Sequence, residues 1–161
     1  MVGKALVIVT LAFGVASQAM AAGSPSPSRP PLPAPSRPQP TDYELGVKAV
    51  KAKDWSRAVA LLQKVVQAEP GNAEAWNYLG YSHRHLKKFD QSLAAYQKAL
   101  AINPDHRGAN EYLGELYLQL GEPEKARERL EKLRVLCPSG CEEYDDLAKA
   151  IRAYETTRKS G

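Results

Sequence analysis

The chain has 161 residues, of which 43% are hydrophobic and 25% are charged, enough for one modest folded domain. Its formal net charge is +4, but three basic residues, Lys4, Arg29 and Arg37, lie before residue 39. The remaining chain holds 19 basic and 18 acidic residues that alternate along the sequence, so it offers no continuous basic stripe to phosphates. Nucleic acid is therefore not an expected partner.

The segment 1–40 does not have the composition of a folded domain. Lys4 precedes an apolar run over residues 5–17, too short to span a membrane comfortably, and small residues follow at positions 19 and 21. We expect residues 1–21 to be a cleaved bacterial signal peptide, so that the protein is periplasmic or secreted and has no stable membrane insertion. The alternative is an uncleaved N-terminal anchor. Residues 22–40 are rich in Pro and Ser and predict an extended, disordered linker.

A Leu-Gly pair and a proline recur along the rest of the chain at one fixed spacing. The pair stands at 45–46, 79–80 and 113–114, and the proline at 70, 104 and 138. A constant period of this size is typical of solenoids, in which each structural unit stacks on its neighbour. The spacing therefore predicts a repeat architecture and argues against a compact enzyme domain.

The middle unit shows how one repeat folds. Residues 73–86 and 89–102 each carry apolar side chains at helical spacing, and the chain between them is too short for anything but a turn. Pro104 ends the second stretch, because proline cannot continue the helical hydrogen bonds. One unit is thus a predicted helical hairpin. Gly80 would let its first helix closely approach the second, where Ser92 is also small.

The middle unit closely resembles the tetratricopeptide repeat. The positions that carry this resemblance are Trp76, Leu79, Gly80, Ser92, Tyr96, Ala99 and Pro104. The flanking units match less fully, with Asp42 and Asn110 at the tryptophan position. The resemblance implies an all-α solenoid of three helical hairpins over residues 41–138, with repeats at about 39–72, 73–106 and 107–140.

A further amphipathic stretch follows the third unit. Residues 141–158 place Tyr144, Leu147, Ile151 and Tyr154 on one stripe and have acidic residues at the N-terminal end, which suits the helix dipole. We expect a capping helix that covers the open apolar edge of the last repeat. The alternative is a detachable helix that engages a partner.

Cys137 and Cys141 are the only cysteines, and they flank the turn sequence Pro-Ser-Gly. In an exported protein such a pair is typical of a disulfide, which would fix the angle at which the capping helix leaves the solenoid. A thiol redox role or metal handling by the two cysteines is the alternative. A metal site needs further ligands, and nothing in the sequence places one, such as His106, beside the two cysteines. We therefore expect no metal site.

The sequence holds no recognisable catalytic constellation. It contains no glycine-rich phosphate loop, no HExxH pattern and no GxSxG turn, and its acidic pairs are adjacent along one helix. His83 and His85 are separated by a single residue, so on a helix they point in different directions and cannot chelate one ion. We therefore expect a non-enzymatic protein without a cofactor.

The resemblance also indicates where a partner would bind. In this family the first helix of each repeat lines a concave groove, and its exposed positions select a protein or peptide ligand. Carried onto this chain, those positions are Tyr43, Val47, Lys51, Asn77, Tyr81, Arg84, His85, Glu111, Glu115 and Gln119. The lysine and asparagine clamp that grips chaperone C-termini is absent, since its places hold Tyr43, Val47, Tyr78, Gly108 and Tyr112. The expected function is an interaction module of the envelope that binds a partner peptide or helix; the alternative is a self-assembling structural protein, a homo-oligomer.

Overall fold

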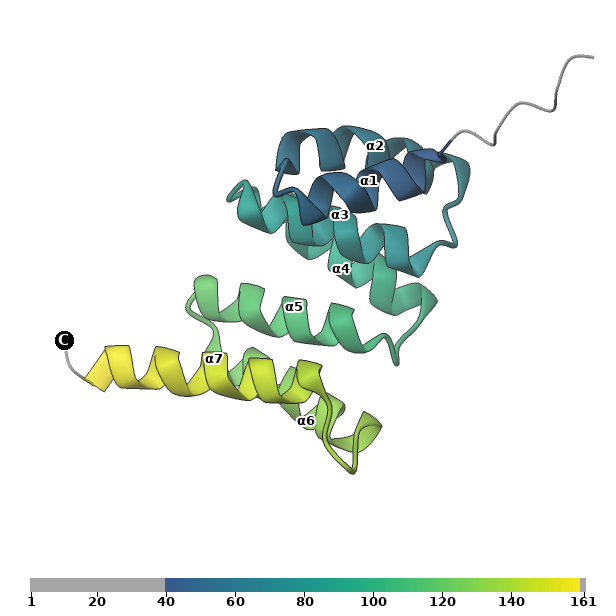
Figure 1. Ribbon diagram of the computed structural model, residues 1–161. Coiled ribbons are helices and arrows are strands. Elements are labelled where there is room, and N and C mark those ends of the chain that lie inside the picture. Colours follow the sequence, from purple (N-terminus) through teal and green to yellow (C-terminus); the bar gives the residue numbers. More distant parts are fainter. Residues whose placement is uncertain (1–39, 160–161) are drawn as a thin grey trace, which may run out of the picture. The chain divides into compact units, whose positions relative to one another are not determined.

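The computed structural model describes residues 40–159, and this part of the chain is built of α-helices. The helices are α1 (Asp42–Lys51), α2 (Trp55–Ala68), α3 (Ala73–His85), α4 (Phe89–Ile102), α5 (Arg107–Gln119), α6 (Pro123–Leu136) and α7 (Glu142–Lys159). The first six pair in chain order into three hairpins, and α7 lies against α5 and α6 (Figure 1). The all-α hairpin architecture is confirmed, whereas the predicted signal peptide and most of the predicted linker fall outside the described residues.

No helix within residues 40–159 is both long and apolar enough to cross a membrane. The first helices of the three hairpins touch one another, α1 against α3 and α3 against α5. Their side chains therefore share one surface, which we call the first-helix surface. The second helices, α2, α4 and α6, pack against their own hairpin partner and also against the helix that follows them in the chain.

Side chains at equivalent positions cap two of the first helices. Asn72 accepts a hydrogen bond of 2.9 Å from the Ala75 N–H at the start of α3. His106 stands one repeat period later and accepts a hydrogen bond of 3.3 Å, through Nδ1, from the Ala109 N–H at the start of α5. Such caps satisfy N–H groups that have no partner inside the helix and contribute about 1 kcal/mol each.

The close approach predicted at Gly80 is present. A Cβ at Gly80 would lie 2.7 Å from Cδ1 of Tyr96, a ring that is fully buried. Ser92 donates a hydrogen bond of 2.8 Å to the Gly80 carbonyl, so α3 and α4 meet through two small residues. This packing requires small side chains, because a larger residue on either helix would force the two apart.

The third hairpin departs from the repeat at the equivalent glycine. A Cβ at Gly114 would lie 2.5 Å from a methyl group of Leu147, which is on α7. The repeat period places Leu130 of α6 here, but Leu130 is only partly buried and Leu147 is fully buried. The capping helix thus supplies the apolar side chain that the second helix supplies in the first two hairpins.

Two repeats carry different residues at one equivalent position, Trp76 and Asn110, but the two side chains make the same kind of hydrogen bond. The Trp76 indole N–H donates a hydrogen bond of 3.0 Å to the Pro70 carbonyl. Asn110 occupies the equivalent position in the third hairpin, and its Nδ2 donates one of 3.2 Å to the Pro104 carbonyl. The loop before each of these first helices is therefore tied down in the same way, although the side chains differ in size.

The link to α7 is short and covalently closed. Cys137 directly follows α6 and Cys141 directly precedes α7; their sulfur atoms are at disulfide distance, with 5.8 Å between the Cα atoms. Arg107 on α5 pairs with Glu143 at 3.5 Å. Together these contacts hold the N-terminal end of α7 beside the N-terminal end of α5.

Candidate functional site

A buried arginine occupies the middle of the first-helix surface. Its guanidinium lies over the ring of Tyr81, 5.3 Å from the centroid, and over that of Tyr112, at 5.8 Å. Nη2 of Arg84 is 2.5 Å from Oε2 of Glu115. Only 8% of Arg84 is exposed. We call these four residues the Arg84 cluster.

The Arg84 cluster contains one pair of opposite charges, Arg84 and Glu115, which compensate each other. Burial raises the pKa of the Tyr81 and Tyr112 hydroxyls above the usual range, so both phenols stay neutral. Removing a guanidinium from water is costly unless a carboxylate and aromatic faces replace the solvent, and Glu115 and the two rings do so here. The charge of Arg84 is therefore compensated within the chain, before any partner binds.

Aromatic side chains extend the Arg84 cluster toward the first hairpin. The His85 ring stacks on Trp55 of α2 with centroids 4.2 Å apart and planes 10° apart, and Tyr81 meets Trp55 edge-on at 5.7 Å. Burial, with the positive charges of Arg84 and Lys53, lowers the pKa of His85, so the neutral imidazole is favoured in the stack. This arrangement gives a partner broad ring surfaces at the border of α2 and α3.

A cavity of about 510 Å³ opens on the other side of the Arg84 cluster, among the N-terminal halves of α3, α5 and α7. We call it the Glu111 cavity. Acidic groups dominate its lining. The lining residues are Glu74, Asn77, Tyr78, Asn103, Asp105, His106, Arg107, Gly108, Glu111, Tyr112, Glu142, Glu143 and Asp146.

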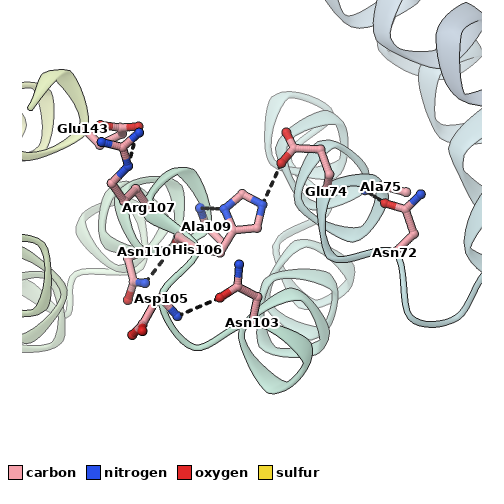
Figure 2. Close-up of polar contacts among 10 residues, drawn as sticks. All are labelled: Asn72, Glu74, Ala75, Asn103, Asp105, His106, Arg107, Ala109, Asn110 and Glu143. Atoms are coloured by element: carbon pink, nitrogen blue, oxygen red, sulfur yellow. Dashed lines mark hydrogen bonds and ion pairs between the residues drawn. The ribbon is translucent and has the colours of Figure 1, made fainter. Parts of the chain in front are cut away.

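Polar contacts order one wall of the Glu111 cavity (Figure 2). His106 accepts the Ala109 N–H at Nδ1, so in the neutral ring Nε2 carries the proton, and Nε2 lies 2.9 Å from Oε2 of Glu74. The hydrogen bond from His106 holds the pKa of Glu74 below its ordinary value. Figure 2 also shows Arg107 turned toward Glu143 of α7. Each of these carboxylates therefore has a partner from another helix.

Glu111 differs from its acidic neighbours. Only 7% of the residue is exposed. Within the described residues its carboxylate makes no ion pair or hydrogen bond, and Arg84, whose positive charge acts on Glu111, is engaged by Glu115. Burial raises the pKa of Glu111 to about 8, helped by the negative charges of Glu115, Asp146 and Glu143 and opposed by Arg84.

The predicted groove residues all lie on first helices, but they form separate groups. The structure brings Tyr81, Arg84, His85 and Glu115 together and places Asn77 and Glu111 in the neighbouring cavity. Tyr43, Val47 and Lys51 lie on α1. Burial raises the pKa of Tyr43, and so do the nearby charges of Glu74 and Tyr78 in the cavity wall. Gln119 is exposed near the end of α5 and lines a hollow together with Arg84 and Glu115.

The expectation that these positions are exposed is wrong for three of them. Asn77, Arg84 and Glu111 are each at least nine-tenths buried. Helices α3 and α5 pack closely enough for Arg84 to reach Glu115, and α7 approaches α5 near Glu111. Partner binding by any of the ten positions stays a prediction.

Several lining residues were missed by reasoning from sequence. Trp55 lies on a second helix, where the resemblance places no ligand contact. The sequence singles out Tyr112 only as a position of the absent clamp. His106 could have been found from the period, because it stands one full repeat after the capping Asn72. No repeat position in the sequence indicates that Glu74 and the acidic N-terminal end of α7 would line the same cavity.

The cysteines form a candidate metal group only if they are reduced. Cys137, Cys141 and Glu143 bring their ligand atoms within 4.8 Å of one another, the one such group among residues 40–159. In the structure the two sulfurs are instead at disulfide distance. The disulfide expected from the sequence is thus supported by the geometry, and the redox or metal alternative stays a prediction.

Comparisons with known proteins agree on the fold. Two family models, both described as tetratricopeptide repeat, match residues 43–106 and 83–151. The chain is 32% identical over 114 residues to Protein FlbA of Caulobacter vibrioides, an alignment that covers 71% of this chain and 19% of FlbA. It is 34% identical over 74 residues to Tetratricopeptide repeat protein 37 of Xenopus laevis, covering 46% of this chain and 5% of that protein. The chain thus spans a small part of these relatives.

Solved structures give the same result. The first tetratricopeptide repeat domain of Spaghetti (RPAP3), bound to the HSP90 peptide SRMEEVD, matches with a TM-score of 0.62 and 25% identity, over 70% of this chain and 89% of that one. MamA from Desulfovibrio magneticus RS-1, residues 41 to the end, matches with a TM-score of 0.58 and 26% identity, over 61% and 55%. PcrH in complex with the chaperone binding region of PopD shares the fold, with a TM-score of 0.62 and 23% identity over 73% and 90%.

Proposed function

Because the chain belongs to the tetratricopeptide repeat family, whose domains serve as protein interaction modules, we propose that it is a non-catalytic adaptor of the bacterial envelope. In this proposal a peptide or helix of a partner protein docks on the first-helix surface, across the Arg84 cluster. The family and its interaction role follow from the matches; the envelope location and the docking surface are the proposed parts.

The Arg84 cluster is the single observation that carries the docking surface. Tyr, Trp and Arg side chains contribute disproportionately to binding energy when they are rigid and partly shielded from water. Here Tyr81 and Tyr112 are held by Arg84, and Trp55 by His85, before any partner arrives. A partner would therefore lose little free energy in ordering the contact surface.

The partner class differs from that of the HSP90 peptide bound by the Spaghetti domain. That peptide, SRMEEVD, is acidic at its C-terminal end. In this chain the corresponding clamp positions hold apolar, aromatic or glycine residues, and the adjacent cavity is lined by carboxylates. Like charges across an interface disfavour binding, so we propose that an acidic C-terminus is not the ligand.

Export to the envelope is proposed from the sequence of residues 1–40. The apolar run and the small residues at 19 and 21 support a signal peptide, and the Pro-rich stretch supports a spacer. Expression of the full chain in a bacterium, followed by mass spectrometry of the N-terminus in osmotic-shock and spheroplast fractions, tests this. Removal of residues 1–21 and recovery in the shock fraction are expected; an intact N-terminus in the spheroplast cytosol contradicts export.

Docking is tested by selecting peptides from a random library on the full chain and measuring their dissociation constants. Tyr81→Ala should weaken binding by about tenfold or more, because it removes a central ring. Lys98→Ala changes an exposed residue of α4 and is the matched control, with no expected effect. Equal affinity of Tyr81→Ala and wild type for every selected peptide would rule out this surface.

A further inference from the structure

We infer that the Glu111 cavity receives one basic side chain, the ammonium of a lysine or the guanidinium of an arginine, from the partner segment that docks on the first-helix surface. This inference rests on the proposed function, because it assigns a residue class to the same partner. It extends that proposal to a second, chemically distinct subsite beside the Arg84 cluster.

Glu111 is the first reason. Only 7% of Glu111 is exposed, and a carboxyl group held in such a place normally has a cation or several hydrogen-bond donors beside it. Glu111 has neither within the described residues, and it lines a cavity large enough for a side chain. The missing partner is therefore expected from outside the chain.

The local structure does not explain Glu111 as it explains its acidic neighbours. Glu74, Glu142 and Glu143 stand in the first turns of α3 and α7, where negative charge is stabilised by the helix dipole. Glu111 lies beyond the first turn of α5, which begins at Arg107. The dipole effect has fallen off there, so position in the helix gives Glu111 no compensation.

Asn77 is an independent second indication. The residue is 3% exposed, and its Oδ1 atom has no hydrogen-bond partner. Its Nδ2 lies beside Gly108, where an added Cβ would be only 3.3 Å away. A buried amide oxygen without a donor is unusual. Asn77 lines the same cavity as Glu111, so the wall of the cavity holds a buried acceptor without a donor beside a carboxyl group without a cation.

The basic residues of the chain nearest to the cavity are already engaged. Arg84 pairs with Glu115, and Arg107 pairs with Glu143 while remaining largely exposed. His106 is fixed between Ala109 and Glu74. Among the described residues none of these three side chains pairs with Glu111 in this arrangement.

The shape of the cavity favours a basic side chain over a metal ion. The carboxylates of the lining do not converge, since the one group of three ligand atoms within metal-binding reach in residues 40–159 is the cysteine pair with Glu143. The volume of about 510 Å³ also far exceeds that of an ion. Tyr78 and Tyr112 also line the cavity, and aromatic rings attract ammonium and guanidinium groups.

The test uses the peptides selected on the full chain. We expect a lysine or arginine to be enriched at one fixed position of these peptides. Replacing that lysine by norleucine, or that arginine by citrulline, keeps the stem and removes the charge, and should weaken binding about tenfold. Glu111→Gln should weaken the unmodified peptide by a similar factor and leave the uncharged peptide unaffected, since both changes remove one interaction. Glu128→Gln, an exposed carboxylate of α6, is the matched control and should change nothing.

Three results would overturn the inference. If the selected peptides carry no enriched basic residue and bind Glu111→Gln as tightly as wild type, the cavity is not a subsite, although docking on the first-helix surface stands. If no peptide binds at all, the proposed function fails as well. If calcium chloride at micromolar concentration binds wild type but not Glu111→Gln and displaces the peptide, the site is a metal site.

Discussion

Replacing Glu111 by glutamine should stabilise the free protein, and the gain should depend on pH. The folded pKa of about 8 lies above the value of 4.5 for an unperturbed glutamate, so folding disfavours the charged form. Below the lower value the carboxyl is neutral in both states. As the pH rises, the unfolded chain ionises first, and the stability of the wild type falls until Glu111 is ionised in the folded state too. The amide of the Glu111→Gln variant does not titrate, so the variant keeps its stability over this range.

The shift in pKa sets an upper limit of ~5 kcal/mol on this effect. Because the carboxylate faces a cavity that is open to water, solvent screening reduces it, and we expect a gain of about 1–2 kcal/mol. The assay is urea unfolding followed by circular dichroism in steps between about pH 4 and pH 9. The difference between Glu111→Gln and wild type should be near zero at the acidic end and reach its plateau above the folded pKa. Glu128→Gln, which removes an exposed carboxylate of α6, is the control.

The reasoning is refuted if Glu111→Gln is less stable than wild type at the alkaline end, or if the difference is the same at every pH. Either result would mean that the Glu111 carboxylate is compensated in the folded protein. If the account is correct, Glu111→Gln has opposite effects in the two experiments: it stabilises the free chain and weakens the complex with the basic peptides.

Three further changes test the packing of the hairpins by urea unfolding. Gly80→Ala should destabilise by about 1–2 kcal/mol, since overpacking against the Tyr96 ring outweighs the helix propensity of alanine; an equal or higher midpoint would contradict the close approach. Lys87→Gly should stabilise by about 0.5–1 kcal/mol because Lys87 has φ of 59°, a conformation that favours glycine; a loss of stability would mean that the lysine side chain contributes there. Reducing the Cys137 to Cys141 bond should cost about 2 kcal/mol from loop closure alone, and an unchanged midpoint would show that the bond is absent in solution.

The repeat period predicts the parts of the structure that every hairpin shares. Gly80 and Ser92 were expected to allow close helix packing, and the structure shows the Ser92 hydroxyl bonded to the Gly80 carbonyl. The turn residues Lys53, Lys87 and Gly121 follow the same period, and all three have positive φ. These features depend on contacts within one repeat, so a pattern along the chain is enough to find them.

The contacts made by α7 could not be found in this way. Leu147 stands one period after Leu113, but the glycines of the first two hairpins, Gly46 and Gly80, meet side chains of second helices. The period therefore does not indicate that Leu147 would pack on Gly114. The burial of Glu111 has a related cause, because α5 packs against α3 on one side and α7 on the other. The Glu111 cavity is therefore a product of tertiary packing at the end of the solenoid.

The location of a bound peptide is the most direct test of the central claim. Amide chemical shifts of the isotope-labelled full chain can be followed by NMR during titration with a selected peptide. The largest changes should fall on α3 and α5, around Tyr81 and Glu111, with small changes on α2, α4 and α6 away from Trp55. Changes concentrated on the outer faces of α4 and α6 would contradict docking on the first-helix surface.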